Sequence, residues 1–235
     1  MDSLRKTALV AGVLYLLTFV SIPTLALYSS VRGANYIVGA GPDTPAIVGG
    51  VLELIVALAG VGTAVALYSV VKRQNEGLAL AFVGSRILEG AAIVTGVVSL
   101  LSVVALRKAG AGPDALVTGR ALVAVYDETM LLGQTLMPCV NALLLGSLLY
   151  RSRLVPRVLP TLGLLGAPLL LACVIARMFG VIDAASVWSV IATVPIALWE
   201  FSLGVWLVVK GFKPSPITAG MTAAGTPTAY RDVAV

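Results

Sequence analysis

The sequence predicts an all-α integral membrane protein, and three observations lead to that fold class. The chain has 235 residues, of which 59% are hydrophobic and only 11% are charged, whereas a soluble domain carries about 25% charged residues. The apolar residues form long blocks and not heptads or Gly-X-Y triplets, which excludes coiled coils and collagen. Each block reaches the roughly 20 residues that a helix needs to cross a bilayer. We therefore expect one six-helix transmembrane bundle.

Six apolar blocks have this length, and polar segments separate them. The predicted helices span residues 7–28, 46–71, 78–106, 121–150, 156–180 and 186–210. Short polar turns begin at Lys72 and Arg151, whereas longer loops are expected at 33–45 and 107–119. The first block lacks a convincing small-residue cleavage site, so we interpret it as a retained helix and not as a signal peptide.

Lys and Arg are distributed unequally between the two sets of connections. One set holds ten, namely Arg5, Lys6, Lys72, Arg73, Arg151, Arg153, Arg157, Lys210, Lys213 and Arg231, and the other holds four, namely Arg32, Arg107, Lys108 and Arg120. The positive-inside rule therefore predicts that both termini are cytoplasmic. Residues 1–213 would form a single transmembrane domain and residues 214–235, rich in Thr, Ala and Gly, a flexible cytoplasmic tail.

Several absences narrow the chemistry. The chain has no histidine, which removes the commonest general base and metal ligand near neutral pH. Cys139 and Cys173 each lie alone in an apolar stretch, so we interpret both as buried packing residues. No P-loop or Rossmann fingerprint occurs. We expect no metal and no cofactor, and the net charge of +5 follows from the bias in the connections, so no nucleic-acid partner is expected.

Polar residues inside the predicted helices are the candidates for a functional site. A charged side chain at a helix centre costs about 2.5–3.5 kcal/mol, so such residues persist mainly when they are paired, neutralised or facing water. The candidates for binding a substrate or a proton are Glu53, Arg86, Glu89, Asp127, Glu128, Gln134, Asn141, Arg177, Trp199 and Glu200.

Four of these candidates are expected near the outer side of the membrane. With a rise of 1.5 Å per residue, Glu53, Asp127 and Glu128 lie roughly 10 Å below the outer ends of their helices. Arg177 falls within a turn of the outer end of the fifth helix. We expect these four side chains to share one outward-facing polar zone.

Three charged candidates are expected deeper in the membrane. Arg86 and Glu89 are three residues apart and so lie on one helix face, and Glu200 would tie the sixth helix to the third. These residues form structural ion pairs, or an acid among them takes up protons or binds a polar group. A third alternative, most relevant to Arg177 and Asp127, is that a charged side chain extends to the membrane interface. The sequence leaves all three open.

The uncharged candidates have weaker interpretations. Gln134 and Asn141 flank Pro138, which removes a backbone hydrogen bond and can kink its helix. They line a polar cavity or, as we prefer, form hydrogen bonds between helices. Trp199 precedes Glu200 and would form the wall of a pocket.

Two segments resemble a known family. Arg86-Ile87-Leu88-Glu89-Gly90 in the third helix, together with Glu200 and the closing run Trp206-Leu207-Val208-Val209-Lys210-Gly211-Phe212, resemble bacterial multi-pass membrane proteins that carry domain of unknown function 4386. The resemblance covers roughly residues 5–213. It implies a compact bundle in the bacterial inner membrane and implies nothing about activity.

Three functions fit these observations. The first is binding or transport of a small polar or cationic solute, coupled to protons, because five intramembrane acids face two arginines. The second is an intramembrane acid–base enzyme for a lipid-like or isoprenoid substrate, with Glu89 or Glu200 as acid. The third is an accessory or assembly subunit that docks on a larger membrane complex through its packing faces. The possible protein partners are a second copy of the chain or such a complex. A cavity that reaches the acids favours the first two functions, whereas acids neutralised in pairs favour the third.

Overall fold

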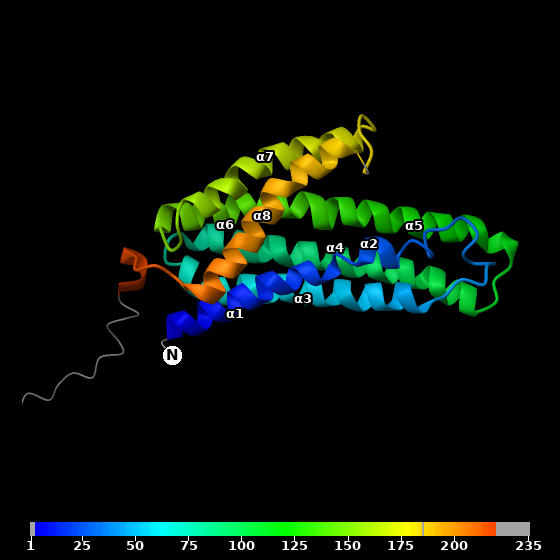
Figure 1. The fold of residues 1–235 in the computed structure, drawn as a ribbon, viewed down its shortest axis with the longest axis horizontal. Coiled ribbons are helices and arrows are strands. Elements are labelled where there is room, and N and C mark those ends of the chain that lie inside the picture. Colours follow the sequence, from blue (N-terminus) through cyan, green and yellow to red (C-terminus); the bar gives the residue numbers. More distant parts are fainter. Residues whose placement is uncertain (1–2, 185, 220–235) are drawn as a thin grey trace, which may run out of the picture.

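The computed structural model describes residues 3–184 and 186–219, and these form a bundle of helices (Figure 1). The α-helices are α1 Ser3–Leu17, α2 Thr24–Leu27, α3 Thr44–Val71, α4 Glu76–Lys108, α5 Leu116–Met130, α6 Met137–Ser152, α7 Val158–Met178 and α8 Val187–Val209. Short 3-10 helices cover Thr18–Ser21, Pro113–Ala115 and Pro216–Thr218, and a π-helix covers Leu131–Leu136. Within the described residues, six helical segments are long and apolar enough to cross a membrane, which confirms the predicted fold class.

The six spans pack as a ring in the order of the chain. Each span contacts the next one, and α8 closes the ring by packing along α1. The closing contact is tight because Gly12 of α1 faces Gly204 of α8: a Cβ atom at Gly12 would lie 2.8 Å from the Gly204 carbonyl oxygen. The ring encloses its centre, so a polar group there is shielded from the surrounding lipid.

The two ends of the bundle differ, and we name them by what they carry. The N-terminal end carries the start of α1, the turns 72–75 and 153–157, and the end of α8, whereas the loop end carries the segments 28–43 and 109–115 and the turn 179–186. Figure 1 shows the α7–α8 hairpin inclined to the other spans, with its turn lying beside α5. The charge count predicts that the N-terminal end is cytoplasmic.

The first span is interrupted where the sequence predicts one continuous helix over 7–28. The α-helix α1 ends at Leu17, a 3-10 turn follows, and α2 starts after Pro23. Proline has no N–H to donate and disfavours α geometry in the residue before it. The span therefore tightens before Pro23 and resumes as a single helical turn.

The fourth span is longer than predicted, and it widens at its middle. The predicted loop 107–119 is mostly helical, because α4 continues to Lys108 and α5 starts at Leu116. A π-helix, Leu131–Leu136, directly precedes the turn that contains Pro138. Pro138 cannot donate to the Gln134 carbonyl, and π-turns of this kind occur often at functional sites.

The chain after α8 stays on the bundle for several residues. The Lys213 amide donates to the Leu154 carbonyl at 2.7 Å, and the Ser215 hydroxyl donates to the Ser152 carbonyl at 2.6 Å. Thr218 is buried. Residues 214–219 are thus packed against the α6–α7 turn, unlike the flexible tail predicted to begin at 214, and residues 220–235 of that tail lie outside the described residues.

A group of polar side chains, Tyr36, Asp43 and Arg107, attaches the segment 28–43 to the loop end of α4, and we call this group the polar latch. The Tyr36 hydroxyl donates to Asp43 Oδ1 at 2.6 Å, and Arg107 donates to the same carboxylate and, at 3.1 Å, to the Gly39 carbonyl. The hydrogen bond from Tyr36, with those from Arg107, holds the pKa of the Asp43 carboxyl below its usual range. Asp43 lies outside the membrane spans, so this latch responds to bulk pH.

We expect Asp43→Asn to weaken the latch only where Asp43 is ionised. The folded-state pKa lies below the unfolded value of about 3.9, so the stabilisation is fully present above that value and is lost as pH falls through the lower folded one. Thermal unfolding in detergent should therefore show a wild-type advantage at pH 6 that shrinks progressively as the pH falls below about 3.9. A difference between the two proteins that stays constant over this range would contradict the assignment.

Candidate functional site

A cavity of about 410 Å³ opens at the loop end, between the α7–α8 turn and the spans that carry α2, α3 and α5. Its lining includes four acids, namely Glu53, Asp127, Glu128 and Asp183, and two bases, namely Arg32 and Arg177. The structure thus brings together the four residues expected in one outer polar zone. Full ionisation of the six side chains would leave the cavity negative.

Glu53 is a buried residue in the lining of this cavity, and two tyrosines hold its carboxylate. Its side chain is almost fully buried, with the residue 1% exposed. The Tyr126 hydroxyl donates to Glu53 Oε1 at 2.7 Å, and the Tyr28 hydroxyl donates to Oε2 at 3.1 Å. Among the described residues, no Lys or Arg nitrogen lies within 4.0 Å of this carboxylate. Glu53 is therefore a buried acid without a cation of its own.

Arg32 reaches the cavity from the connecting segment 28–43. It forms an ion pair with Asp127, and its guanidinium lies over the Tyr126 ring, 5.7 Å from the ring centroid. Both charged side chains of the pair are 43% exposed. This arrangement shows that the cavity wall accommodates a cation between a carboxylate and an aromatic face, as in other cation–π sites.

The π-helix contributes uncharged polar groups to the same cavity. Gln134 and Thr135 both belong to its lining, and the Gln134 Nε2 atom is buried with no hydrogen-bond partner among the described residues. Buried polar atoms are nearly always hydrogen-bonded. The unpaired amide donor of Gln134 is therefore a candidate hydrogen-bond partner for a ligand or water in this cavity.

The deeper charged residues form a separate network around Arg86 at the centre of the ring. Arg86 Nη1 lies 3.0 Å from Glu89 Oε2, and Nη2 lies 2.7 Å from Glu200 Oε1. Nη2 also donates to the Tyr15 hydroxyl at 3.2 Å. Arg86 is 2% exposed, so one buried guanidinium holds α1, α4 and α8 together.

Asn141 extends this network to α6. Its Nδ2 donates to Glu89 Oε2 at 2.7 Å, and its Oδ1 accepts from the Ser85 hydroxyl at 2.5 Å. Of the two interpretations of Asn141, the structure favours hydrogen bonding between helices over lining of a cavity. Four of the six spans thus contribute to one hydrogen-bonded cluster, which we call the Arg86 network (Tyr15, Ser85, Arg86, Glu89, Asn141 and Glu200).

Trp199 belongs to the hydrophobic core and not to the wall of the loop-end cavity. Its side chain is fully buried. Gly163 of α7 packs so closely against the indole ring that a Cβ atom at this position would lie 2.6 Å from Trp199 Cδ2. The indole Nε1 has no hydrogen-bond partner among the described residues. Trp199 and Glu200 are consecutive residues of α8, but successive residues of a helix point in different directions. The expectation that Trp199 would line a pocket next to Glu200 overlooked this difference.

The comparison with protein families identifies the chain. A family model described as "Domain of unknown function (DUF4386)" matches residues 10–211, which is most of the sequence. The chain belongs to the DUF4386 family. No curated protein and no solved structure matches it.

The DUF4386 match confirms the resemblance seen in the segments around Arg86 and Glu200. It covers five spans in full and the first span from residue 10, so both the Arg86 network and the lining of the loop-end cavity lie within the family domain. Within residues 3–184 and 186–219 of this DUF4386 chain, no three Cys, Asp or Glu side chains are grouped to hold a metal ion. The polar side chains inside the bundle and in the cavity are mainly carboxylates, guanidinium groups and phenols.

Sequence reasoning about this DUF4386 chain missed the phenols and one arginine. Tyr15, Tyr28 and Tyr126 each donate to or accept from a charged group inside the bundle. Tyr126 directly precedes the candidate Asp127, and this position could have indicated that Tyr126 lies near the same polar zone. Arg32 was assigned to a loop, and only the fold of segment 28–43 brings it to Asp127.

Proposed function

We propose that the loop-end cavity binds a small cationic or polar solute and that Glu53 holds the solute's positive charge. The observation that carries this proposal is a buried carboxylate, without a basic partner among the described residues, in the lining of a cavity of about 410 Å³. Cavities of roughly 300–1,000 Å³ suit small-molecule ligands. Arg32 neutralises Asp127, which leaves Glu53, Glu128 and Asp183 facing Arg177.

The contacts of Glu53 leave room for a ligand. An ionised carboxylate has about four acceptor positions, and the two tyrosine hydroxyls use one on each oxygen. These hydroxyls fix the orientation of the carboxylate, so its free positions are preorganised. Gln134 of the π-helix supplies a hydrogen-bond donor for a polar group of the same solute.

Proton coupling follows from the same geometry. A cation binds an ionised carboxylate and not a protonated one, so the solute and a proton compete for Glu53. Intramembrane carboxylates commonly serve as such exchange sites in transporters. We therefore propose that solute binding at Glu53 is coupled to proton release and that this exchange is the basis of transport.

An accessory role is the second candidate function, and the Arg86 network favours it. Arg86 is paired with both Glu89 and Glu200, as expected for residues that hold a bundle together. The two functions involve different residues. Experiments on Glu53 therefore test the binding proposal without disturbing the network.

The binding proposal predicts that choline binds to the full chain in lipid nanodiscs and that its uncharged isostere 3,3-dimethylbutan-1-ol does not. Glu53→Gln keeps the size and one acceptor oxygen but removes the charge, so we expect at least a tenfold loss of choline affinity, about 1.4 kcal/mol. Titration calorimetry measures both ligands. Wild-type affinity for choline should rise as pH increases, because a larger fraction of Glu53 is then ionised.

Glu76→Gln provides the control, because Glu76 lies at the N-terminal end, where its carboxylate accepts a hydrogen bond from the Tyr68 hydroxyl. This variant should bind choline as the wild type does. Equal binding of choline and its isostere, or full choline affinity in Glu53→Gln, would overturn the proposal. Loss of binding in both variants would show that the charge at Glu53 is not the cause and would equally overturn it.

A further inference from the structure

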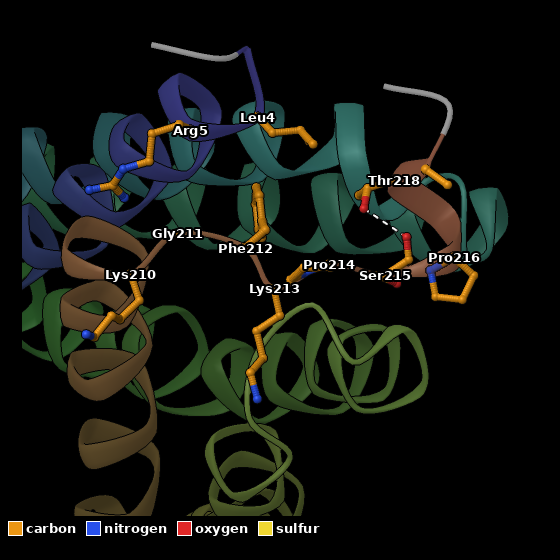
Figure 2. A pocket seen from close by; sticks show the side chains of 11 residues that line it. Leu4, Arg5, Lys210, Gly211, Phe212, Lys213, Pro214, Ser215, Pro216 and Thr218 are labelled. Carbon is orange, nitrogen blue, oxygen red and sulfur yellow. Dashed lines mark hydrogen bonds between the residues drawn. The ribbon is translucent and has the colours of Figure 1, made fainter. Parts of the chain in front are cut away.

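A second, basic pocket lies at the N-terminal end, where the chain leaves α8. It has a volume of about 590 Å³ and includes Arg5, Lys210 and Lys213 in its lining, together with apolar walls from Leu4 and Phe212. Among the described residues, its lining contains no Asp or Glu. Figure 2 shows the Lys210 and Lys213 side chains on one side of the segment 210–214, which follows α8, and the Phe212 ring on the other side.

The three cations of this pocket are not equivalent. Arg5 caps α8, because its Nη1 donates to the Leu207 carbonyl at 2.9 Å and its Nη2 to the Val208 carbonyl at 2.5 Å. Lys210 and Lys213 are exposed, and neither has a carboxylate within 4.0 Å among the described residues. Two ammonium groups are thus available to an anion.

An apolar groove continues from the pocket along the membrane-spanning part of α8. Lys210 belongs to both linings, and the groove runs past Val209, Val205 and Phe201, with Leu159 of α7 on its other side. Its volume is about 400 Å³. Phe201 is 50% exposed and Val209 is 61% exposed, and since α8 spans the membrane these side chains face lipid.

We propose that the two exposed lysines at the edge of the basic pocket, Lys210 and Lys213, form together with the apolar groove a binding site for an anionic phospholipid. The phosphate lies between Lys210 and Lys213, and one acyl chain follows the groove along α8. Basic pockets between transmembrane helices bind anionic lipid headgroups in this way. A free phosphate ion would satisfy the two lysines but would leave the groove without an occupant.

The location of the site agrees with the predicted orientation. Anionic lipids give the cytoplasmic leaflet its negative surface potential, and the positive-inside count predicts that the N-terminal end is cytoplasmic. The site is at the opposite end of the bundle from Glu53, so it is independent of the proposed solute cavity, and a failure of one proposal leaves the other unaffected.

The test measures phosphatidylglycerol binding to the purified full chain by native mass spectrometry, with phosphatidylcholine as the zwitterionic comparison. A lysine near the membrane surface contributes about a fivefold gain in binding. We therefore expect the double variant Lys210→Gln/Lys213→Gln to lose roughly 30-fold in phosphatidylglycerol affinity. The matched control, Lys72→Gln/Arg73→Gln, removes two charges from the α3–α4 turn at the same end and should keep wild-type affinity.

Two further experiments, a groove-filling variant and a competition with soluble phosphates, identify the chemistry of the ligand. Val205→Trp fills the groove without changing charge, so it should weaken phosphatidylglycerol binding and leave the lysines intact. Excess inorganic phosphate or glycerol 1-phosphate should not displace the lipid. Displacement by either ion would assign the site to soluble phosphates, whereas equal loss in the double variant and its control, or no loss in the double variant, would overturn the site itself.

Discussion

Replacing Arg86 with glutamine is expected to lower the free energy of unfolding by about 3–5 kcal/mol, the usual loss when one partner of a buried ion pair is removed. The reason is that Glu89 and Glu200 would be left buried without the guanidinium that contacts both. The hydrogen bond to Tyr15 would be lost as well. Equilibrium unfolding of the protein in bicelles with increasing SDS measures the change.

The triple variant Arg86→Gln/Glu89→Gln/Glu200→Gln separates charge from packing. It removes all three charges and keeps amide groups of similar size, so it should recover most of the lost stability. Arg73→Gln is the control, because this exposed arginine should change stability by no more than about 0.5 kcal/mol. A triple variant as unstable as Arg86→Gln would show that the charge imbalance is not the cause.

Gly163→Ala is the second substitution with a large expected effect. A Cβ atom at residue 163 would lie 2.6 Å from Trp199 Cδ2, and the fully buried indole has no space into which to move. Overpacking of this kind costs about 1–3 kcal/mol. The same unfolding assay measures it, and the buried Trp199 should also give an altered near-ultraviolet circular dichroism signal.

Gly84→Ala is the matched control for this substitution. Gly84 is also helical, but no atom lies within 4 Å of the position that its Cβ would occupy. Alanine is favoured over glycine inside a helix by roughly 0.5–1 kcal/mol. The two substitutions should therefore change stability in opposite directions, and equal effects would contradict the packing of Gly163 against Trp199.

The sequence was sufficient for the spans because apolar length alone decides whether a helix can cross the membrane. Its predictions were weakest where the backbone departs from α geometry. Pro138 was expected to disrupt its helix, whereas Pro23 lies in a span that was predicted to be continuous. The backbone responds differently near the two prolines: a 3-10 turn forms in one span and a π-helix in the other. Which of these forms depends on the neighbouring helices that must satisfy the freed carbonyls.

The candidate sites were predictable where one helix determines the geometry. Arg86 and Glu89 are three residues apart, so their pairing follows from helix geometry. The contacts of Glu53 with Tyr28 and Tyr126 depend on how three spans pack against each other, and hydropathy carries no information on that. Arg32 shows the same limit, since its pairing with Asp127 depends on the fold of an irregular segment.

The closed ring has a consequence for how the protein is made. Ribosomes add about 5–20 residues per second, so the span that contains Tyr15 waits roughly 10–40 s in the membrane before Glu200 is synthesised. During that interval Arg86 already has Glu89 beside it on the same helix and enters the bilayer as a locally neutral pair. The last span then delivers Glu200 and closes the ring against a first span that had no permanent neighbour on that face.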